Sequence, residues 1–530
     1  MLEDSKNYRN IEEAKTMKKR LLIAIIIIFS AVWVVSDAFS QDKTPVRGGI
    51  LREIQPNGPK SLSYYPEMGP GESTAALPAA EKLMEYNQDK QLVPLLAESV
   101  AVGLDGKSIT FRLKKGIQFH DGSDFNAEAV AWNYQLAKDT KRLQYDPKLL
   151  RIEVVDNYTV RFHITNYTNQ ILHSFGWVPI FSKVAWDKAG GGSIEKSKDW
   201  ARANIVATGP FKLAEYKRDN YIRWVRNENY WQAGKPYLDG ITVRYIPDPV
   251  TASALMQAKE ADWWGGAPVK DQADLEKKGF IRQSGYGLPR MIYMNNKDPN
   301  SKFVNQKVRE AVEYALDKAA IAKALGFGYY TPLTMVAPPG EWGYDPDYKG
   351  RPYDPAKAKQ LLAEAGYPNG LEVKLMAMAV PPWPDEAQAV KRYLDDAGFK
   401  VELDMADPGR FFQTLWMRGW PDMILFLTGM DPNYLMTFHR QFGPEPMSNY
   451  ASLKRPPDLT ALAEKSLTLL NEKDQKEITK PLVRMMADEA LVIPLYRAPA
   501  AYIIQPWVHT TYLKEQLVAR RTYDEWMDKH

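Results

Sequence analysis

The sequence contains no cysteine among its 530 residues. Disulfide bonds therefore contribute nothing to the stability of the folded chain. A lipid-modified cysteine is equally excluded, so we expect no lipoprotein anchor. These two absences matter because the chain begins with a segment that is typical of exported proteins.

Residues 1–40 are expected to form a secretory signal peptide, and Met17 is an alternative start of the chain. The stretch "MKKRLLIAIIIIFSAVWVVSDAFSQD" has a basic start, an apolar run and small residues before Gln41, which is the pattern of a cleaved signal. The apolar run is shorter than the roughly 20 residues that a membrane-spanning helix needs. We therefore expect cleavage and a periplasmic protein; the alternative is a retained membrane anchor.

Histidine is scarce, and the six that occur are scattered along the sequence. None has the spacing of a metal site, and the sequence lacks a His-Glu-x-x-His pattern, a G-x-S-x-G elbow, a phosphate-binding loop and a dinucleotide glycine pattern. The S-x-x-K match at Ser193–Lys196 has no S-D-N or K-T-G partner. We therefore expect no metal, no cofactor and no catalysis. A glycosidase that uses carboxylates stays open as the enzyme alternative.

Charge of one sign is not in excess, because 69 Lys and Arg stand against 65 Asp and Glu. The sequence has no basic stripe, so nucleic acid is not expected as a partner. No segment after the signal is apolar enough to span a membrane. The length predicts two or three domains.

Hydrophobic periodicity predicts a large α/β protein with two lobes. In the first part of the chain we expect a strand at 48–56, a helix at 74–86 and a helix at 126–139 that Asn126 caps. A second series begins near residue 290, with one amphipathic helix at 305–325. A strand–helix–strand unit at 371–407 implies parallel pairing.

Several stretches resemble family 5 of the extracellular solute-binding proteins, which serve ABC transporters for oligopeptides, dipeptides and nickel. They are "RLKKGIQFHDGSDFNAEAV" (112–130), "TGPFKL" (208–213), "RNENYWQAGKPYLDGITVRYIPD" (226–248), "VREAVEYALDKAAI" (308–321), "DPAKAKQLLAEAGYP" (354–368) and "IPLY" (493–496). Their order along some 400 residues makes the resemblance specific.

The resemblance implies a periplasmic binding protein of the second type, enlarged by an extra domain. Its domains would be domain I at 41–85, 205–288 and 500–530, the extra domain II at 86–204, and domain III at 289–499. Two crossovers near residues 288 and 499 would form a hinge. Such a protein is expected to be a monomer that closes over a solute and docks on a membrane permease.

The resemblance also places "KEADWWGGAP" (259–268) at the cleft between domains I and III. We expect at least one of the two indoles, Trp263 or Trp264, to face the ligand. Of the two, Trp264 is the first candidate. Gly265 would let backbone groups approach it. The alternative is that both indoles pack in the protein's own core.

Other candidate ligand contacts come from the loops that line the cleft in this family, and a structural role is the alternative for each. On the domain I side they are Met68 and Gly69; on the domain III side they are Trp383, Trp416, Thr428, Gly429, Asp431, Tyr496 and Arg497.

One position departs from the peptide binders of the family. In those proteins an aspartate four residues before the proline of a "DP" pair holds the α-amino group, and here that position is Thr428, before Asp431-Pro432. A threonine supplies no charge, so Asp431 could hold an amine only if the loop is rearranged. A peptide-like solute remains the first expectation. The alternatives are an oligosaccharide stacked on tryptophan or another non-peptide solute such as a nickel chelate, and a chaperone-like binder of unfolded segments.

Overall fold

The computed structural model describes residues 44–529, apart from 65–66, 69, 88–90, 141–147, 430, 432, 445, 447–449 and 511–519. The expected signal peptide lies outside the described residues. Within these ranges no helix is both long and apolar enough to cross a membrane.

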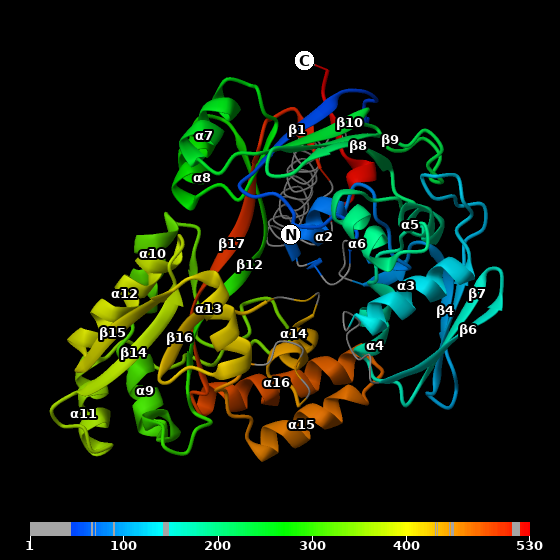
Figure 1. Cartoon of the computed structure of the whole chain (residues 1–530). Helices are drawn as coiled ribbons and strands as arrows, with labels where there is room; N and C mark the ends of the chain where they lie inside the picture. Colours follow the sequence, from blue (N-terminus) through cyan, green and yellow to red (C-terminus); the bar gives the residue numbers. More distant parts are fainter. Residues whose placement is uncertain are drawn as a thin grey trace, which may run out of the picture. The chain divides into compact units, whose positions relative to one another are not determined.

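An eleven-stranded mixed sheet runs through the molecule in the order β15-β14-β16-β12-β17-β11-β1-β10-β9-β8, with β13 paired to β17 (Figure 1). The β14–β15 and β14–β16 pairs are parallel, as the strand–helix–strand pattern predicts, whereas β12 is antiparallel to both of its neighbours. The strands are β1 (Ile50–Gln55), β8 (Phe211–Lys217), β9 (Tyr221–Arg226), β10 (Gly240–Tyr245), β11 (Trp263–Gly265), β12 (Ile281–Met294), β13 (Thr331–Pro332), β14 (Leu371–Met378), β15 (Phe399–Ala406), β16 (Met423–Leu427) and β17 (Val492–Ile504).

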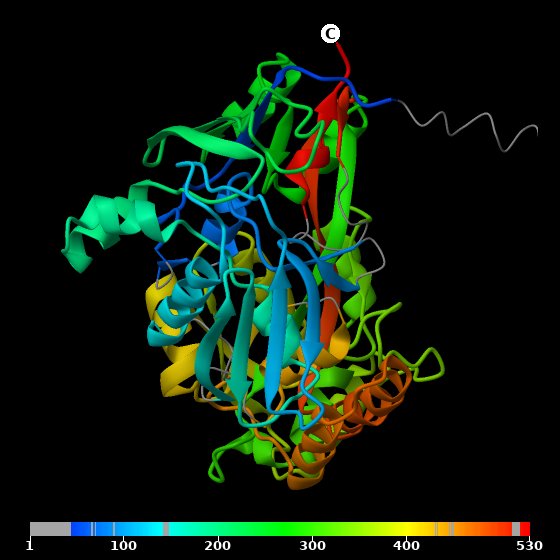
Figure 2. The ribbon, with the colours of Figure 1, turned by 90° about the vertical axis from the view of Figure 1, so that its right-hand side faces the viewer.

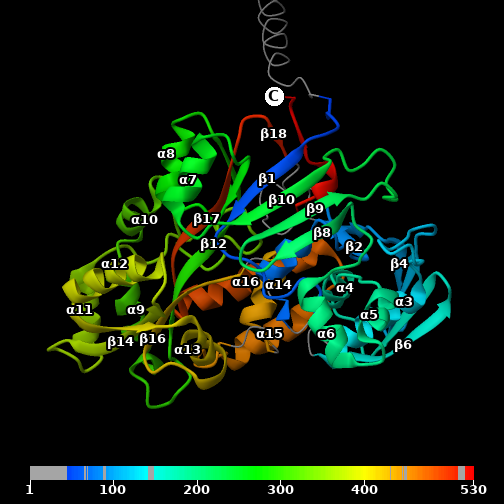
Figure 3. The ribbon, with the colours of Figure 1, turned by 45° about the horizontal axis from the view of Figure 1, so that its top comes forward.

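A separate four-stranded antiparallel sheet has the order β4-β5-β7-β6, and Figure 2 shows its blue and cyan strands side by side. Alternate residues of β5 and β7 are buried, because α3 covers one face of this sheet. Helices α5 and α6 lie beside α3 (Figure 3). The remaining strands are β2 (Met84–Tyr86), β3 (Leu92–Pro94), β4 (Ala97–Val102), β5 (Ser108–Leu113), β6 (Leu149–Asp156), β7 (Thr159–Ile164), β18 (Val508–His509) and β19 (Trp526–Met527).

Many of the helices begin at a polar side-chain cap that satisfies free backbone N–H groups, and others begin after a proline without such a cap. Asn126 caps α3 as the sequence predicts, because its side-chain oxygen accepts from the N–H of Ala129 at 3.0 Å. The helices are α2 (Pro70–Ala76), α3 (Ala127–Asp139), α4 (Ile171–Gly176), α5 (Lys183–Gly190), α6 (Ile194–Ala203), α7 (Pro249–Gln257), α8 (Val269–Glu276), α9 (Gln306–Tyr314), α10 (Lys318–Gly326), α11 (Pro355–Glu364), α12 (Trp383–Asp396), α13 (Pro408–Gln413), α14 (Tyr434–Gln441), α15 (Pro457–Leu467) and α16 (Glu472–Asp488).

Two expected helices differ from the observed structure. The single helix expected at 305–325 is two helices, α9 and α10, because Asp317 interrupts it and caps α10 by accepting from the N–H of Ala320. The helix expected at 74–86 is wrong as well: α2 ends at Ala76, and residues 84–86 form β2 instead. There Met84 and Tyr86 alternate with Glu85, which is the period of a strand.

Two large hydrophobic cores draw on different parts of the chain. The C-terminal core is built only from residues between Met291 and Ala498. The N-terminal core uses residues 51–263 and 504–527 and includes the four-stranded sheet. Strands β12 and β17 pair with each other where the chain passes between the two cores. Leu288 lies opposite Ala498 there, and Gly287 lies opposite Pro499, so the two expected crossovers are neighbours. The exact domain boundaries stay a prediction.

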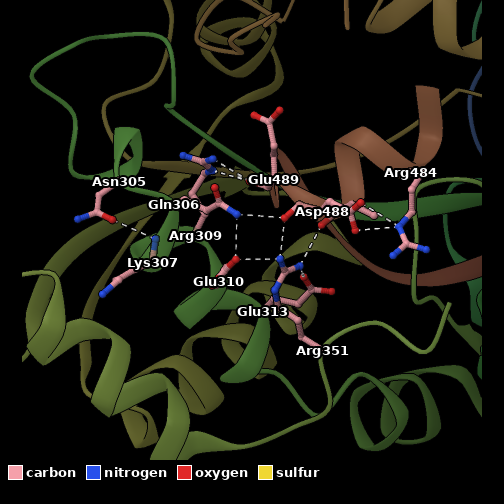
Figure 4. Close-up of polar contacts among 11 residues, drawn as sticks. Asn305, Gln306, Lys307, Arg309, Glu310, Glu313, Arg351, Arg484, Asp488 and Glu489 are labelled. Carbon is pink, nitrogen blue, oxygen red and sulfur yellow. Dashed lines mark hydrogen bonds and ion pairs between the residues drawn. The ribbon is translucent and has the colours of Figure 1, made fainter. Parts of the chain in front are cut away.

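A polar network in the C-terminal lobe holds α9 against the end of α16 (Figure 4). Arg351 donates to the carboxylates of Glu310 and Glu313 and to the carbonyl oxygens of Ala487 and Asp488, at 2.8–3.0 Å. Arg309 donates to the carbonyl of Glu489. These arginines satisfy carbonyls that the helix end leaves free, and so they fix the frame of this lobe.

Candidate ligand-binding site

The tryptophan pair forms the strand β11, which lies between β1 and β17. Successive side chains of a strand point to opposite faces, and the two indoles accordingly enter different cores. Trp263 is 0% exposed in the N-terminal core; its ring centroid lies 4.9 Å from that of Tyr502, and the guanidinium of Arg520 lies 4.4 Å from its ring.

Trp264 is 2% exposed and packs in a third, smaller core with Ile54, Met256 and Ile503. A Cβ at Gly265 would lie 2.3 Å from the side-chain amide of Gln55, so the glycine accommodates the protein's own side chain. This packing favours the alternative in which both indoles are structural. A ligand-facing role for Trp264 or Gly265 stays a prediction.

The adjacent strands β16, β12 and β17 bring together three predicted site residues that are far apart in the sequence. Thr428 follows β16, and its N–H donates to the carbonyl of Pro289 in β12. On the other side of β12, Tyr496 lies opposite Arg290, and Arg497 lies opposite Pro289. A single strand, β12, thus separates Thr428 from Tyr496 and Arg497.

Trp383, at the start of α12, joins this group through its indole. Its ring stacks on Phe426 of β16 with centroids 5.5 Å apart, and the guanidinium of Arg290 lies 4.7 Å from it. Glu386, one turn along α12, accepts from Nε of Arg290 at 3.0 Å and 3.1 Å. Burial alone would lower the pKa of Arg290, but the carboxylate of Glu386 holds it above its usual value. Arg290 is therefore a permanent, paired charge.

Tyr496 is fully buried and stacks on Tyr330, with ring centroids 5.0 Å apart and planes 11° from parallel. Burial raises the pKa of Tyr496 well above its usual value, so the phenol is neutral. Around Arg290 the chain therefore gathers three aromatic rings, those of Trp383, Tyr330 and Tyr496. Flat rings of this kind recognise apolar or planar groups by stacking.

Thr428 is 0% exposed, and its hydroxyl is part of a neutral contact group. Its Oγ1 lies 2.7 Å from the hydroxyl oxygen of Tyr293 and 2.9 Å from the sulfur of Met291. Tyr450 stacks on Tyr293 at 4.5 Å. The position that resembles the amine-holding aspartate is thus occupied by uncharged, mutually bonded groups.

Asp431 forms an ion pair with the protein's own Arg440, at 2.7 Å. Burial raises the pKa of Asp431, and the charge of Arg440 opposes that rise. Arg440 also approaches Gly429, where a Cβ would lie 3.0 Å from the guanidinium. Asp431 and Glu386 are therefore each already paired with an arginine.

The remaining predicted contacts do not touch Arg290 or Thr428 in any described interaction, although Trp416 reaches Phe426 through Phe412. Trp416 is 43% exposed in a π-helical turn, Thr414–Arg418, and stacks on Phe412 at 4.7 Å. Met68 is partly buried against the N-terminal core. Gly69 lies outside the described residues. Whether any of these residues contacts a ligand stays a prediction.

Sequence reasoning missed Arg290, Glu386 and Tyr293. A signal for Arg290 was available, because a charged residue directly before the apolar strand "MIYM" needs a buried partner. Nothing in the sequence names that partner, since Glu386 lies 96 positions away. Tyr293 carries no signal that separates it from ordinary core aromatics.

The structure gives Ser193 a local role. Its side-chain oxygen accepts from the N–H of Lys196 and caps α6, so the serine has a structural role there. Among the described residues no cluster of three or more His, Asp or Glu could hold a metal ion. A cavity of about 60 Å³ lies beside Lys82, Tyr86, Trp177 and Tyr523, and none of the predicted contacts lines it.

Comparison with known sequences places this chain among related proteins. The model of the bacterial extracellular solute-binding proteins, family 5, middle region, matches residues 91–448. The glutathione-binding protein GsiB of Escherichia coli O1:K1 is 33% identical over 333 residues, which are 62% of this chain and 64% of that protein. Heme-binding protein A of Haemophilus influenzae is 35% identical over 321 residues, 55% of this chain and 57% of that protein. The matches thus span less than two thirds of either relative.

The fold also has solved counterparts. The periplasmic binding protein DppA of Helicobacter pylori, solved with the peptide STSA, superposes with a TM-score of 0.80 at 22% identity, over 91% of this chain and 99% of that one. This likeness concerns the fold alone, and it confirms the expected fold class: the α/β fold of type II periplasmic binding proteins, with two lobes.

Proposed function

The chain belongs to family 5 of the bacterial extracellular solute-binding proteins, and we propose that it captures a peptide-like solute between its two lobes for delivery to an ABC transporter permease. The observation that carries this proposal is the 33% identity, over 333 residues, to a protein named for binding glutathione. Binding, rather than turnover, is the proposed role of this chain.

The proposed contact surface on the C-terminal lobe is the set of side chains around β12, β16 and β17. In it the ring of Tyr330 is partly exposed and would contact the solute, whereas Trp383, Tyr293 and Thr428 are buried and would shape the surface from within. The proposed hinge is the pair β12–β17 near Leu288 and Ala498, because these strands carry the chain between the two cores. Domain I (41–85, 205–288, 500–530), domain II (86–204) and domain III (289–499) remain the proposed boundaries.

A second candidate is a solute without a free amino group, such as an oligosaccharide. The pairing of Asp431 with Arg440 and the neutral group at Thr428 favour it, because an ammonium taken out of water needs a free carboxylate. We further propose export to the periplasm after cleavage near Gln41, and a monomer that contacts only its solute and the permease.

The test is native mass spectrometry of protein purified from the periplasm of its own host, followed by calorimetry. The calorimetric probes are reduced glutathione, a pool of di- to pentapeptides and a pool of oligosaccharides. Submicromolar binding of glutathione or of a peptide supports the first candidate. Submicromolar binding of a sugar with no peptide binding replaces it by the second. Turnover of any probe would overturn the binding role.

A further inference from the structure

The segment between β7 and α4 reaches the end of α15 through Asn169. The side-chain Nδ2 of Asn169 donates to the carbonyl oxygens of Ser466 at 2.8 Å and Leu469 at 2.9 Å. The backbone N–H of Asn169 donates to the carbonyl oxygen of Leu467 at 3.1 Å. One residue thus makes three hydrogen bonds to three carbonyl oxygens within the span 466–469, about 300 residues further along the chain.

The orientation of this amide is fixed by its neighbour. Gln170 donates from Nε2 to Oδ1 of Asn169 at 2.7 Å, so the oxygen of Asn169 is occupied and its NH₂ group must face the carbonyls. Asn169 is 6% exposed and Gln170 is 3% exposed. A buried amide whose donors and acceptor are matched in this way specifies one arrangement of its partners.

The receiving end is a helix C-terminus. Helix α15 ends at Leu467, and the last carbonyls of a helix have no partner within it. They also carry the negative end of the helix dipole. Donors are therefore favoured at this position, and a carboxylate would be repelled from it.

The contact joins the two cores at a place apart from β12 and β17. Ile171 and Phe175 of α4 are buried in the N-terminal core, whereas Leu459 and Ala463 of α15 are buried in the C-terminal core. Figures 1 and 3 show α4 and α15 away from the strands that carry the chain between the cores. Nearby, the hydroxyl of Tyr86 contacts the sulfur of Met436 in α14 at 3.9 Å.

We propose that Asn169 is a positioning residue for solute capture: it holds the two lobes in the closed arrangement through the end of α15, without touching the solute. This proposal rests on the proposed function, because capture of a solute between two lobes requires the lobes to open and close. Stabilising the closed state in advance raises the apparent affinity for any solute, since less of the binding free energy goes into closure.

The test measures closure without a solute, so its outcome does not depend on which solute binds. Small-angle X-ray scattering of ligand-depleted protein is compared for wild type, Asn169→Asp, Asn169→Ala and the control Asn166→Ala. Asn166 lies three positions away and is exposed. Loss of two side-chain hydrogen bonds is expected to lower the closed-to-open ratio about 5- to 150-fold in Asn169→Ala. Asn169→Asp, which places a carboxylate against the carbonyls, should lower it at least as much.

The expected result is a larger radius of gyration for both Asn169 variants, with the wild-type far-UV circular dichroism retained and with Asn166→Ala unchanged. Scattering curves of folded Asn169 variants that superpose on the wild-type curve would overturn the proposal. The proposed function fails by a different readout, namely the absence of binding in calorimetry.

If Asn169→Ala and Asn169→Asp do not fold, Gln170→Ala decides the matter, because it keeps the Asn169 side chain and removes only the donor that fixes its orientation. A larger radius of gyration for folded, ligand-depleted Gln170→Ala supports the proposal. A scattering curve that superposes on the wild-type curve contradicts it.

Discussion

The Nε2 atom of His439, in α14, lies 2.7 Å from the hydroxyl oxygen of Ser466, in α15. The hydroxyl of Ser466 itself donates to the carbonyl of Ala463 at 2.7 Å, so Nε2 of His439 must carry the proton. His439 is 3% exposed, and burial lowers its pKa to about 3. The neutral imidazole thus ties α14 to the helix end that Asn169 contacts.

This arrangement predicts a loss of stability in acid. The folded pKa of His439 lies below the unfolded value of about 6.5, so its contribution is complete above pH 6.5 and is lost as the pH falls from 6.5 towards 3. We expect the free energy of unfolding to fall by about 1.4 kcal/mol per pH unit in this window from His439 alone. Urea denaturation at pH 7.5 and at pH 5 measures the free energy of unfolding at each pH. The difference between the two values should be smaller for His439→Gln than for wild type. Equal differences in the two proteins would show that His439 does not cause the loss of stability in acid.

The network in Figure 4 predicts unequal effects for two arginines near the end of α16. Arg351 is 13% exposed and pairs with Glu313, which is 3% exposed. Arg351→Met leaves that carboxylate with Lys318 as its partner and removes the hydrogen bonds of Arg351 to two carbonyl oxygens of α16. We expect a loss of about 2–3 kcal/mol in the free energy of unfolding. Arg484 is 47% exposed and pairs with Asp488 one helical turn away, so Arg484→Met should cost about 0.5 kcal/mol or less.

Urea denaturation of the two variants at pH 7.5 provides the measurement. Arg484→Met serves as the matched control, because it removes an equal charge beside the same helix. Equal losses in the two variants would show that the hydrogen bonds of Arg351 to α16 and α9 add nothing beyond charge.

Local sequence patterns predicted much of this fold, and the reason is physical. The alternation in 371–374 and the uninterrupted apolar run in 423–427 follow from how many faces of each strand are covered, which the sequence records directly. The break at Asp317 was missed because a capping aspartate inside a strong amphipathic pattern changes no apolar position.

The site was harder to predict, because its geometry depends on pairing across the sheet. Thr428, Pro289 and Arg497 meet only because β16 and β17 flank β12, and no local pattern encodes that order. The motif resemblance supplied Thr428 and Tyr496 as candidates. It did not supply Arg440, whose ion pair with Asp431 removes the free carboxylate that a rearranged loop would need.

Trp264→Ala is predicted to act mainly on stability. The indole is 2% exposed among apolar side chains, and truncation of a buried aromatic costs about 3–5 kcal/mol. Thermal unfolding of ligand-free protein should therefore show a clear drop in melting temperature. A wild-type melting temperature together with a weakened solute affinity would restore the ligand-facing role of Trp264.

Trp416→Ala is the matched control for that experiment. Trp416 is 43% exposed, and its ring stacks on that of Phe412. Its removal should cost about 1 kcal/mol or less, within the range of an aromatic pair. Comparable losses for the two variants would show that exposure does not separate the structural indole from the surface one.

The pairing of Asp431 predicts how a bound peptide is anchored. A peptide held by its ammonium on a buried carboxylate loses roughly 30-fold or more in affinity when that charge is removed, because the carboxylate is left unpaired. Here Asp431 keeps Arg440 at 2.7 Å and Glu386 keeps Arg290 at 3.0 Å, and Thr428 offers only a hydroxyl. For any peptide that binds in calorimetry, acetylation of its amino terminus should therefore change the dissociation constant by less than about threefold.

The companion variant is Asp431→Asn, which should lower the melting temperature because it removes the charge that pairs with Arg440. It should change the affinity for free and acetylated peptides by the same factor. A large loss on acetylation that disappears in Asp431→Asn would instead show that the peptide amine displaces Arg440 and that this loop rearranges on binding.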